Sequence, residues 1–81
     1  MGGDKMRYLI KDLQFQDRYF GGDEPVVFNS RKEAIEQLID YHSIDNDMSQ
    51  EKKWLENNDI EKLEIFVKAF KWDIVEKKKG E

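Results

Sequence analysis

The sequence predicts a small two-layer α+β domain, in which a three-stranded antiparallel sheet is covered on one face by two or three helices, ββα(α)αβ. Three observations lead to this prediction. Apolar residues recur with a helical period in residues 30–42 and again in residues 59–70. Apolar and polar side chains alternate near both ends of the chain, as they do in a strand with one buried face. Turn-forming residues at 21–25 separate the first strand from the second.

The composition predicts one folded domain in a reducing compartment. The chain has 81 residues, of which 40% are charged, and its five Phe, three Tyr and two Trp argue against disorder. It has no cysteine, which excludes disulfides and fits the cytoplasm. No apolar run approaches the ~20 residues that cross a bilayer, so we expect no membrane association. We expect residues 1–5 to be a leader added for expression, residues 6–77 the domain and residues 78–81 a charged tail.

The first strand is expected in residues 6–13, with Tyr8 and Ile10 on its buried side. The aromatic residues that follow form no regular pattern. After the Gly-Gly-Asp-Glu-Pro turn, residues 26–28 are expected to form a short second strand that leads directly into the central helix.

The central helix has the clearest signal in the chain. Ser30 and Glu33 form a capping box, in which the Ser30 hydroxyl accepts from the Glu33 N–H and the Glu33 carboxylate reaches back to the Ser30 N–H. We expect the helix to end before residues 45–47. Its apolar arc contains Ala34, Ile35, Leu38, Ile39, Tyr41 and His42.

Two further helices and a strand complete the predicted fold. Residues 49–57 can form a short helix capped by Asp47 or Ser49. A possible capping box at Asn58 and Glu61 opens the helix expected at residues 59–70. Alternation of Leu63, Ile65 and Val67 would also allow a strand, but we prefer the helix because a strand would leave Phe66 and Phe70 outside the core. Within that helix, Glu64 and Lys68 have the spacing of a favourable ion pair. Alternation in residues 72–75 predicts the closing strand.

The chain resembles small uncharacterised proteins encoded by phages and prophages of Gram-positive bacteria. The strings YLIKDLQ, GGDEPVVFNSRKEAIEQLIDYHSID and KWDIVEKK carry the resemblance, which covers most of residues 6–77. It implies a cytoplasmic accessory protein made inside a bacterial host cell, and it carries no catalytic signature.

His42, the sole histidine, is the first residue to consider for chemistry. It could act as a proton carrier or metal ligand with Asp40, Asp45 or Asp47 as partner. We favour a packed ring whose charged form suits the helix C-terminus and whose nitrogen bonds a carbonyl. One histidine, no cysteine and no recognisable carboxylate pair predict a protein that is not an enzyme and that holds no metal or cofactor.

The connection after the central helix partly matches a calcium-binding loop. Asp45, Asp47, Ser49 and Glu56 occupy positions 1, 3, 5 and 12 of an EF-hand loop. Gln50 stands where the turn requires glycine, however, so a polar helix connection is the better interpretation.

Lysines at 77–79 could contact phosphate, but the net charge of −4 argues against nucleic acid as the main partner. A nucleic-acid-associated protein using this Lys-rich end or the open sheet face is the alternative function. Gly21-Gly22 lacks the spacing of a phosphate loop, and no small-molecule substrate is expected.

Apolar residues that the predicted core does not explain favour a protein-binding role. Ile65 falls on the charged side of its helix, Trp54 lies on a short polar helix, and Tyr19 belongs to an aromatic loop. If such residues cluster, they form a surface for a protein partner or for a second copy of the chain. The sequence therefore predicts a protein–protein interaction module with Tyr19, Trp54 and Ile65 as its interaction residues.

Overall fold

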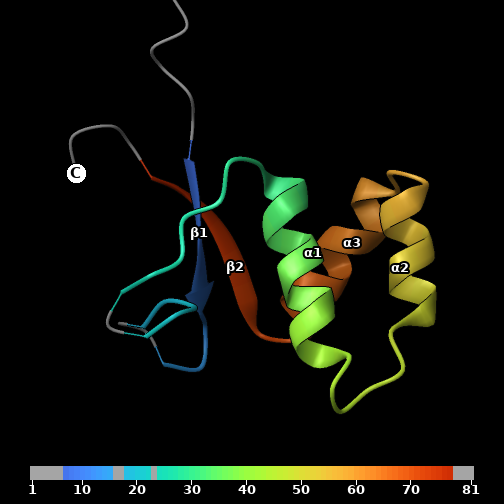
Figure 1. Cartoon of the computed structure of the whole chain (residues 1–81), viewed down its shortest axis with the longest axis horizontal. Coiled ribbons are helices and arrows are strands. Elements are labelled where there is room, and N and C mark those ends of the chain that lie inside the picture. Colours follow the sequence, from blue (N-terminus) through green and yellow to red (C-terminus); the bar gives the residue numbers. More distant parts are fainter. Residues whose placement is uncertain (1–6, 16–17, 23, 78–81) are drawn as a thin grey trace, which may run out of the picture.

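The computed structural model describes residues 7–15, 18–22 and 24–77 of the chain. The order of elements is β1 (Arg7–Asp12), α1 (Arg31–His42), α2 (Ser49–Glu56), α3 (Ile60–Ala69) and β2 (Trp72–Lys77). The two strands pair antiparallel, and the three helices lie on one side of them (Figure 1). The α+β class is therefore confirmed. Within the described residues, no helix combines the length and apolar character needed to cross a bilayer.

β1 and β2 pair in a register that places Ile10 opposite Ile74 and Leu9 opposite Val75. Alternation along a strand puts Ile10 and Ile74 on the same face, and both are buried, with 0% and 5% exposure. Leu9 and Val75 share the other face and are only half-buried. Both terminal strands are confirmed, and the sheet presents one face to the helices and leaves the other open.

The core forms where this sheet face meets α1 and α3. In α1 the apolar arc is confirmed at Ala34, Ile35, Leu38 and Ile39, which have at most 1% exposure. At the end of the arc His42 is half-buried and Tyr41 is 49% exposed. In α3 the expected face is confirmed at Leu63, Phe66 and Val67, whereas Ile60 is 48% exposed. The buried apolar residues are Ile10, Phe28, Ala34, Ile35, Leu38, Ile39, Met48, Leu63, Phe66, Val67 and Ile74.

The N-terminus of α1 is capped largely as predicted. The Ser30 hydroxyl accepts from the Glu33 N–H at 3.1 Å. The return bond differs, because the Glu33 carboxylate accepts from the Asn29 N–H at 3.3 Å instead of from Ser30. The helix ends at His42, as expected from the polar residues that follow.

The second strand expected at residues 26–28 is reduced to a single bridge. Pro25 has no N–H, and the Val26 N–H donates to the Phe20 carbonyl at 3.1 Å, so neither can extend a ladder with β1. Val26 and Val27 are 40% and 36% exposed. Of these three residues only Phe28 pairs with β1, which leaves a two-stranded sheet in the described part of the chain.

The outer edge of β1 is covered by an irregular segment instead of a strand. Tyr8 exchanges two backbone hydrogen bonds with Phe28, of 2.9 and 2.8 Å. Further along, the Phe20 N–H donates to the Ile10 carbonyl at 2.8 Å, and the Asp12 N–H donates to the Arg18 carbonyl at 3.0 Å. Residues from two parts of one loop thus satisfy an edge that a third strand would otherwise cover.

α2 and α3 begin in different ways. α2 has Met48 at its N-cap, with no side-chain cap hydrogen bond, in place of the expected Asp47 or Ser49. The Asp47 carboxylate accepts from the Ser49 N–H at 3.0 Å and from the Ser49 hydroxyl. The capping box predicted at Asn58 and Glu61 is not formed. Asn58 instead adopts a left-handed conformation with φ of 56°, and its side-chain oxygen accepts from Lys32 of α1 at 2.9 Å.

Candidate interaction surface

The outer surface of α3 contains an apolar residue that the fold does not cover. Ile65 is 68% exposed, among the most exposed of the large apolar side chains in the described chain. It lies with Ala69 in a shallow depression of about 480 Å³, whose remaining lining residues are Glu64 and Lys68. The four residues form a small apolar floor with charged sides, which we call the Ile65 surface.

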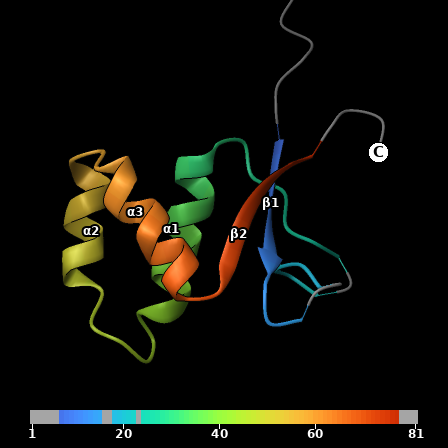
Figure 2. The same cartoon turned by 180° about the vertical axis from the view of Figure 1, so that it is seen from behind.

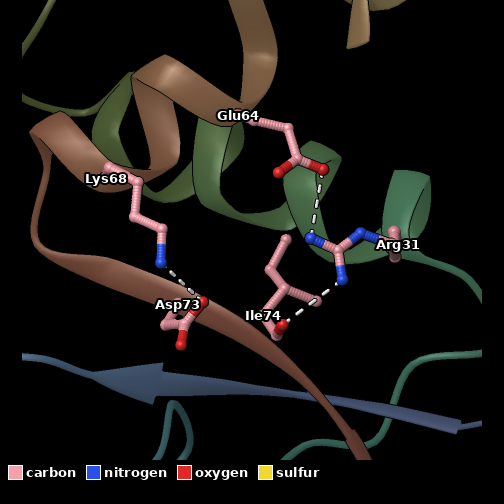
Figure 3. A network of polar contacts seen from close by, with 5 residues as sticks. All are labelled: Arg31, Glu64, Lys68, Asp73 and Ile74. Carbon is pink, nitrogen blue, oxygen red and sulfur yellow. Dashed lines mark hydrogen bonds and ion pairs between the residues drawn. The ribbon is translucent and has the colours of Figure 1, made fainter. Parts of the chain in front are cut away.

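The charged residues of the Ile65 surface are connected to other elements of the fold. Glu64 accepts from the Arg31 guanidinium of α1 at 3.1 Å, and Arg31 also donates to the Ile74 carbonyl of β2 at 3.3 Å (Figure 3). Lys68 pairs with Asp73 of β2 at 2.9 Å (Figure 3). The Glu64–Lys68 pair expected from helical spacing is therefore replaced by two tertiary ion pairs.

These ion pairs orient side chains and contribute little free energy. The Arg31 and Glu64 side chains are 41% and 42% exposed, and pairs of this kind stabilise a fold by about 0–1 kcal/mol each. Helical spacing around Ile65 could have indicated Glu64 and Lys68 as its neighbours. Nothing local indicates Arg31, which lies 33 residues before Glu64 in the chain.

The other two residues expected at an interaction surface lie elsewhere. Trp54 of α2 is half-buried against the core, with the Lys62 ammonium 5.9 Å from its ring centroid. Tyr19 is half-buried and bridges Lys11 along the outer edge of β1, in a segment on the far side of the strands from α2 (Figure 1). Ile65 and Tyr19 therefore do not share one surface.

His42 is held in an aromatic cluster. Its Nε2 atom accepts from the Trp72 indole N–H at 2.9 Å, and its ring lies 4.4 Å from that of Phe70. Burial lowers the pKa of His42 below its ordinary value, and the Asp45 carboxylate opposes this effect. The packed ring is confirmed, but its partner is an indole and not a carbonyl, and its neutral form is the favoured one.

The carboxylates near His42 have structural roles or point to solvent. Asp47 accepts two hydrogen bonds from Ser49 at the start of α2, one from the hydroxyl and one from the backbone N–H, and these lower the pKa of the Asp47 carboxyl. Asp45 and Glu56 are exposed. Among the residues that the structure describes, no group of three or more His, Cys, Asp or Glu is arranged to hold a metal ion. Lys78 and Lys79 of the predicted basic tail lie outside these residues.

No protein family, no curated protein and no solved structure matches this chain.

Proposed function

We propose that the protein is a small non-enzymatic interaction module, which binds a protein partner or a second copy of itself through the Ile65 surface. The exposure of Ile65 within a charged rim carries this proposal. Burying such a side chain contributes about 1.5–3 kcal/mol, and an apolar centre with a polar rim is the usual anatomy of an interface. Trp54, half-buried on the neighbouring helix α2, and Tyr19, beside β1, form contacts separate from the Ile65 surface in this proposal.

The biological setting is also part of the proposal. We place the protein among the accessory proteins of phages that infect Gram-positive bacteria, acting in the cytoplasm of the host cell. The resemblance, which covers most of residues 6–77, and the absence of cysteine from the sequence support this setting. The non-enzymatic role is supported by His42, whose Nε2 atom is occupied by Trp72.

Two matched substitutions test the proposed function. Ile65→Glu places a charge in the apolar floor, whereas Ile44→Glu makes the same change at a 79% exposed residue in the connection between α1 and α2. Tagged wild type and Ile44→Glu should retain the same partners from host lysate, and Ile65→Glu should lose them. If size-exclusion chromatography, crosslinking and capture all show a non-binding monomer for the wild type, the proposal is wrong.

A nucleic-acid-associated role is the second candidate. Arg7 of β1 and Lys77 of β2 occupy facing positions in the strand pair, and Lys11 lies on the same open face of the sheet. Three cations on one face can contact phosphates, and such contacts weaken as salt rises. Titration of single- and double-stranded DNA and RNA at low and high salt tests this candidate. Absence of binding at low salt excludes it, and loss of binding in Arg7→Ala with retention in Lys53→Ala supports it.

A further inference from the structure

The outer edge of β2 carries backbone groups that the fold leaves open. Tyr8 directs both of its backbone groups to Phe28 and therefore away from β2. Its partner in the register, Glu76, must then direct its own backbone groups away from β1, because facing residues in an antiparallel ladder alternate between bonded and non-bonded pairs. The same reasoning applies to Ile74 and Trp72. These three residues form the outer edge of β2.

This edge is open except at the Ile74 carbonyl, which one side chain contacts. Among residues 7–15, 18–22 and 24–77, the only hydrogen bond to the outward backbone groups of Trp72, Ile74 and Glu76 comes from Arg31, which donates to the Ile74 carbonyl at 3.3 Å. Seen from behind, no described element passes in front of β2 (Figure 2). An open strand edge of this kind pairs readily with another strand.

The charges on the open face of the sheet are unevenly distributed along β2. Lys77 faces Arg7 at one end of the strand pair, and like charges in facing positions are unfavourable. Neither of them forms an ion pair with another described residue. At the other end, Asp73 faces Lys11 and pairs with Lys68. The strand therefore has a negative and a positive end on the same face.

We propose, building on the proposed function, that the partner is a second copy of this chain, joined antiparallel along β2 with Val75 on the two-fold axis. This register places Asp73 of each copy opposite Lys77 of the other, which supplies a negative charge beside the lysine that faces Arg7. It also places Ile74 opposite Glu76 of the second copy in bonded pairs. The two sheets then form one continuous sheet in the order β1-β2-β2-β1.

Charge complementarity selects this register over its neighbours. Placing Ile74 on the two-fold axis brings Asp73 opposite Val75 of the second copy and leaves Lys77 opposite residue 71, beyond the end of β2. Placing Asp73 on the axis brings two aspartates face to face. Placing Glu76 on the axis brings two glutamates face to face. Among these registers, only the one centred on Val75 pairs opposite charges between residues of β2, and Glu76 of the second copy then lies beside the Arg31 that contacts the Ile74 carbonyl.

The same association covers the Ile65 surface. α3 lies beside β2, because Lys68 reaches Asp73 and Glu64 meets Arg31 at the edge of that strand (Figure 3). When two copies join along β2, their α3 helices come to lie next to each other. Ile65 then packs against α3 of the second copy, with the small Ala69 side chain permitting close approach. One two-fold contact thus accounts for the open strand edge, the facing cations and the exposed isoleucine.

Two charge-reversal variants test the register. Asp73→Lys puts lysine opposite Lys77 of its own second copy, and Lys77→Asp puts aspartate opposite Asp73. Each variant alone should sediment as a monomer of 9.7 kDa at concentrations where the wild type has twice that mass. An equimolar mixture should recover the doubled mass, because both lysines of the first variant then face the two aspartates of the second. Circular dichroism of each variant establishes that it is folded.

The outcomes separate this inference from the proposed function. A wild-type monomer up to ~1 mM, a doubled mass that both variants retain, or a mixture of folded variants that stays monomeric overturns the inference. If a charge-reversal variant does not fold, Ile65→Glu tests the self-association instead. Loss of the doubled mass in Ile65→Glu, with the doubled mass retained in Ile44→Glu, supports the inference. Retention of the doubled mass in Ile65→Glu overturns it. If the wild type is monomeric but captures another protein through Ile65, the proposed function stands without the self-association.

Discussion

The hydrogen bond between Trp72 and His42 predicts that the protein loses stability on mild acidification. Nε2 of His42 accepts the indole proton at 2.9 Å, so this nitrogen must be unprotonated in the folded state. Protonation places a second N–H against the indole N–H and removes the bond. Since the chain has one histidine, a pH effect between about 7 and about 5.5 reports on this contact.

The direction in which stability changes with pH follows from the lowered pKa of His42. Burial lowers the pKa of His42 in the folded protein below the ordinary value of 6.5 that the unfolded chain retains. The unfolded state therefore binds more protons as the pH falls through 6.5. The stabilising contribution is complete above that pH and is lost as the pH falls through the lower pKa of the folded protein. A neutral hydrogen bond contributes about 0.5–1.5 kcal/mol, and we expect a loss of about 1 kcal/mol, or ~4–8 °C in Tm.

Urea denaturation followed by tryptophan fluorescence at pH 7.5, 6.5 and 5.5 measures this loss directly (the pH values bracket the ordinary histidine pKa of ~6.5). His42→Phe retains an aromatic ring but cannot titrate, so its free energy of unfolding should stay constant over the same range. A wild-type stability that is unchanged or rises on acidification, or a His42→Phe protein with the same pH dependence as the wild type, would refute the reasoning.

Two further substitutions test the packing and the backbone. Leu38→Ala removes a side chain with 0% exposure and should lower the free energy of unfolding by about 2–5 kcal/mol, whereas Ile44→Ala at the surface should change it by less than ~0.5 kcal/mol; equal losses in urea denaturation would contradict the assignment of the core. Lys71→Gly should raise the free energy of unfolding by up to ~1 kcal/mol, because Lys71 follows α3 with a φ of 65°, a conformation that glycine adopts without steric cost. Thermal denaturation measures this gain, and a lower Tm would contradict it.

Where a structural signal is local, the sequence predicted it well. The Ser30–Glu33 contact spans three residues, and the helical period of α1 is set by neighbouring positions, so both are visible without tertiary information. The alternation that predicted β1 and β2 is local in the same way. Two capping contacts differ from expectation because another donor takes the acceptor oxygen. The Asn29 N–H takes the Glu33 carboxylate in place of the Ser30 N–H, and Lys32, 26 residues away, takes the side-chain oxygen of Asn58.

The third strand could not be decided from local pattern. Three apolar residues at 26–28 have strand character, but a strand exists only if its backbone groups find a partner along their whole length. Pro25 offers no N–H, and Phe20 takes the N–H of Val26, so Phe28 alone pairs with Tyr8. The partners involved lie far apart in sequence, and their competition appears only once the chain has folded.

The Ile65 surface was likewise predicted only in part by local sequence spacing. That Ile65 lies outside the apolar face of its helix follows from helical spacing alone, and so does its position beside Ala69. That Glu64 pairs with Arg31 and Lys68 with Asp73, and that Tyr19 lies far from α2, was decided by how the strands and helices pack.

By itself, then, the sequence determined the class of the fold, the inward side of α1 and the exposure of one isoleucine, because periodicity and capping act between residues a few positions apart. Only the tertiary structure decided which charged side chains meet, which edge of the sheet is covered and which is open. Those choices depend on residues distant in the chain that compete for the same hydrogen bonds, and no local pattern records that competition.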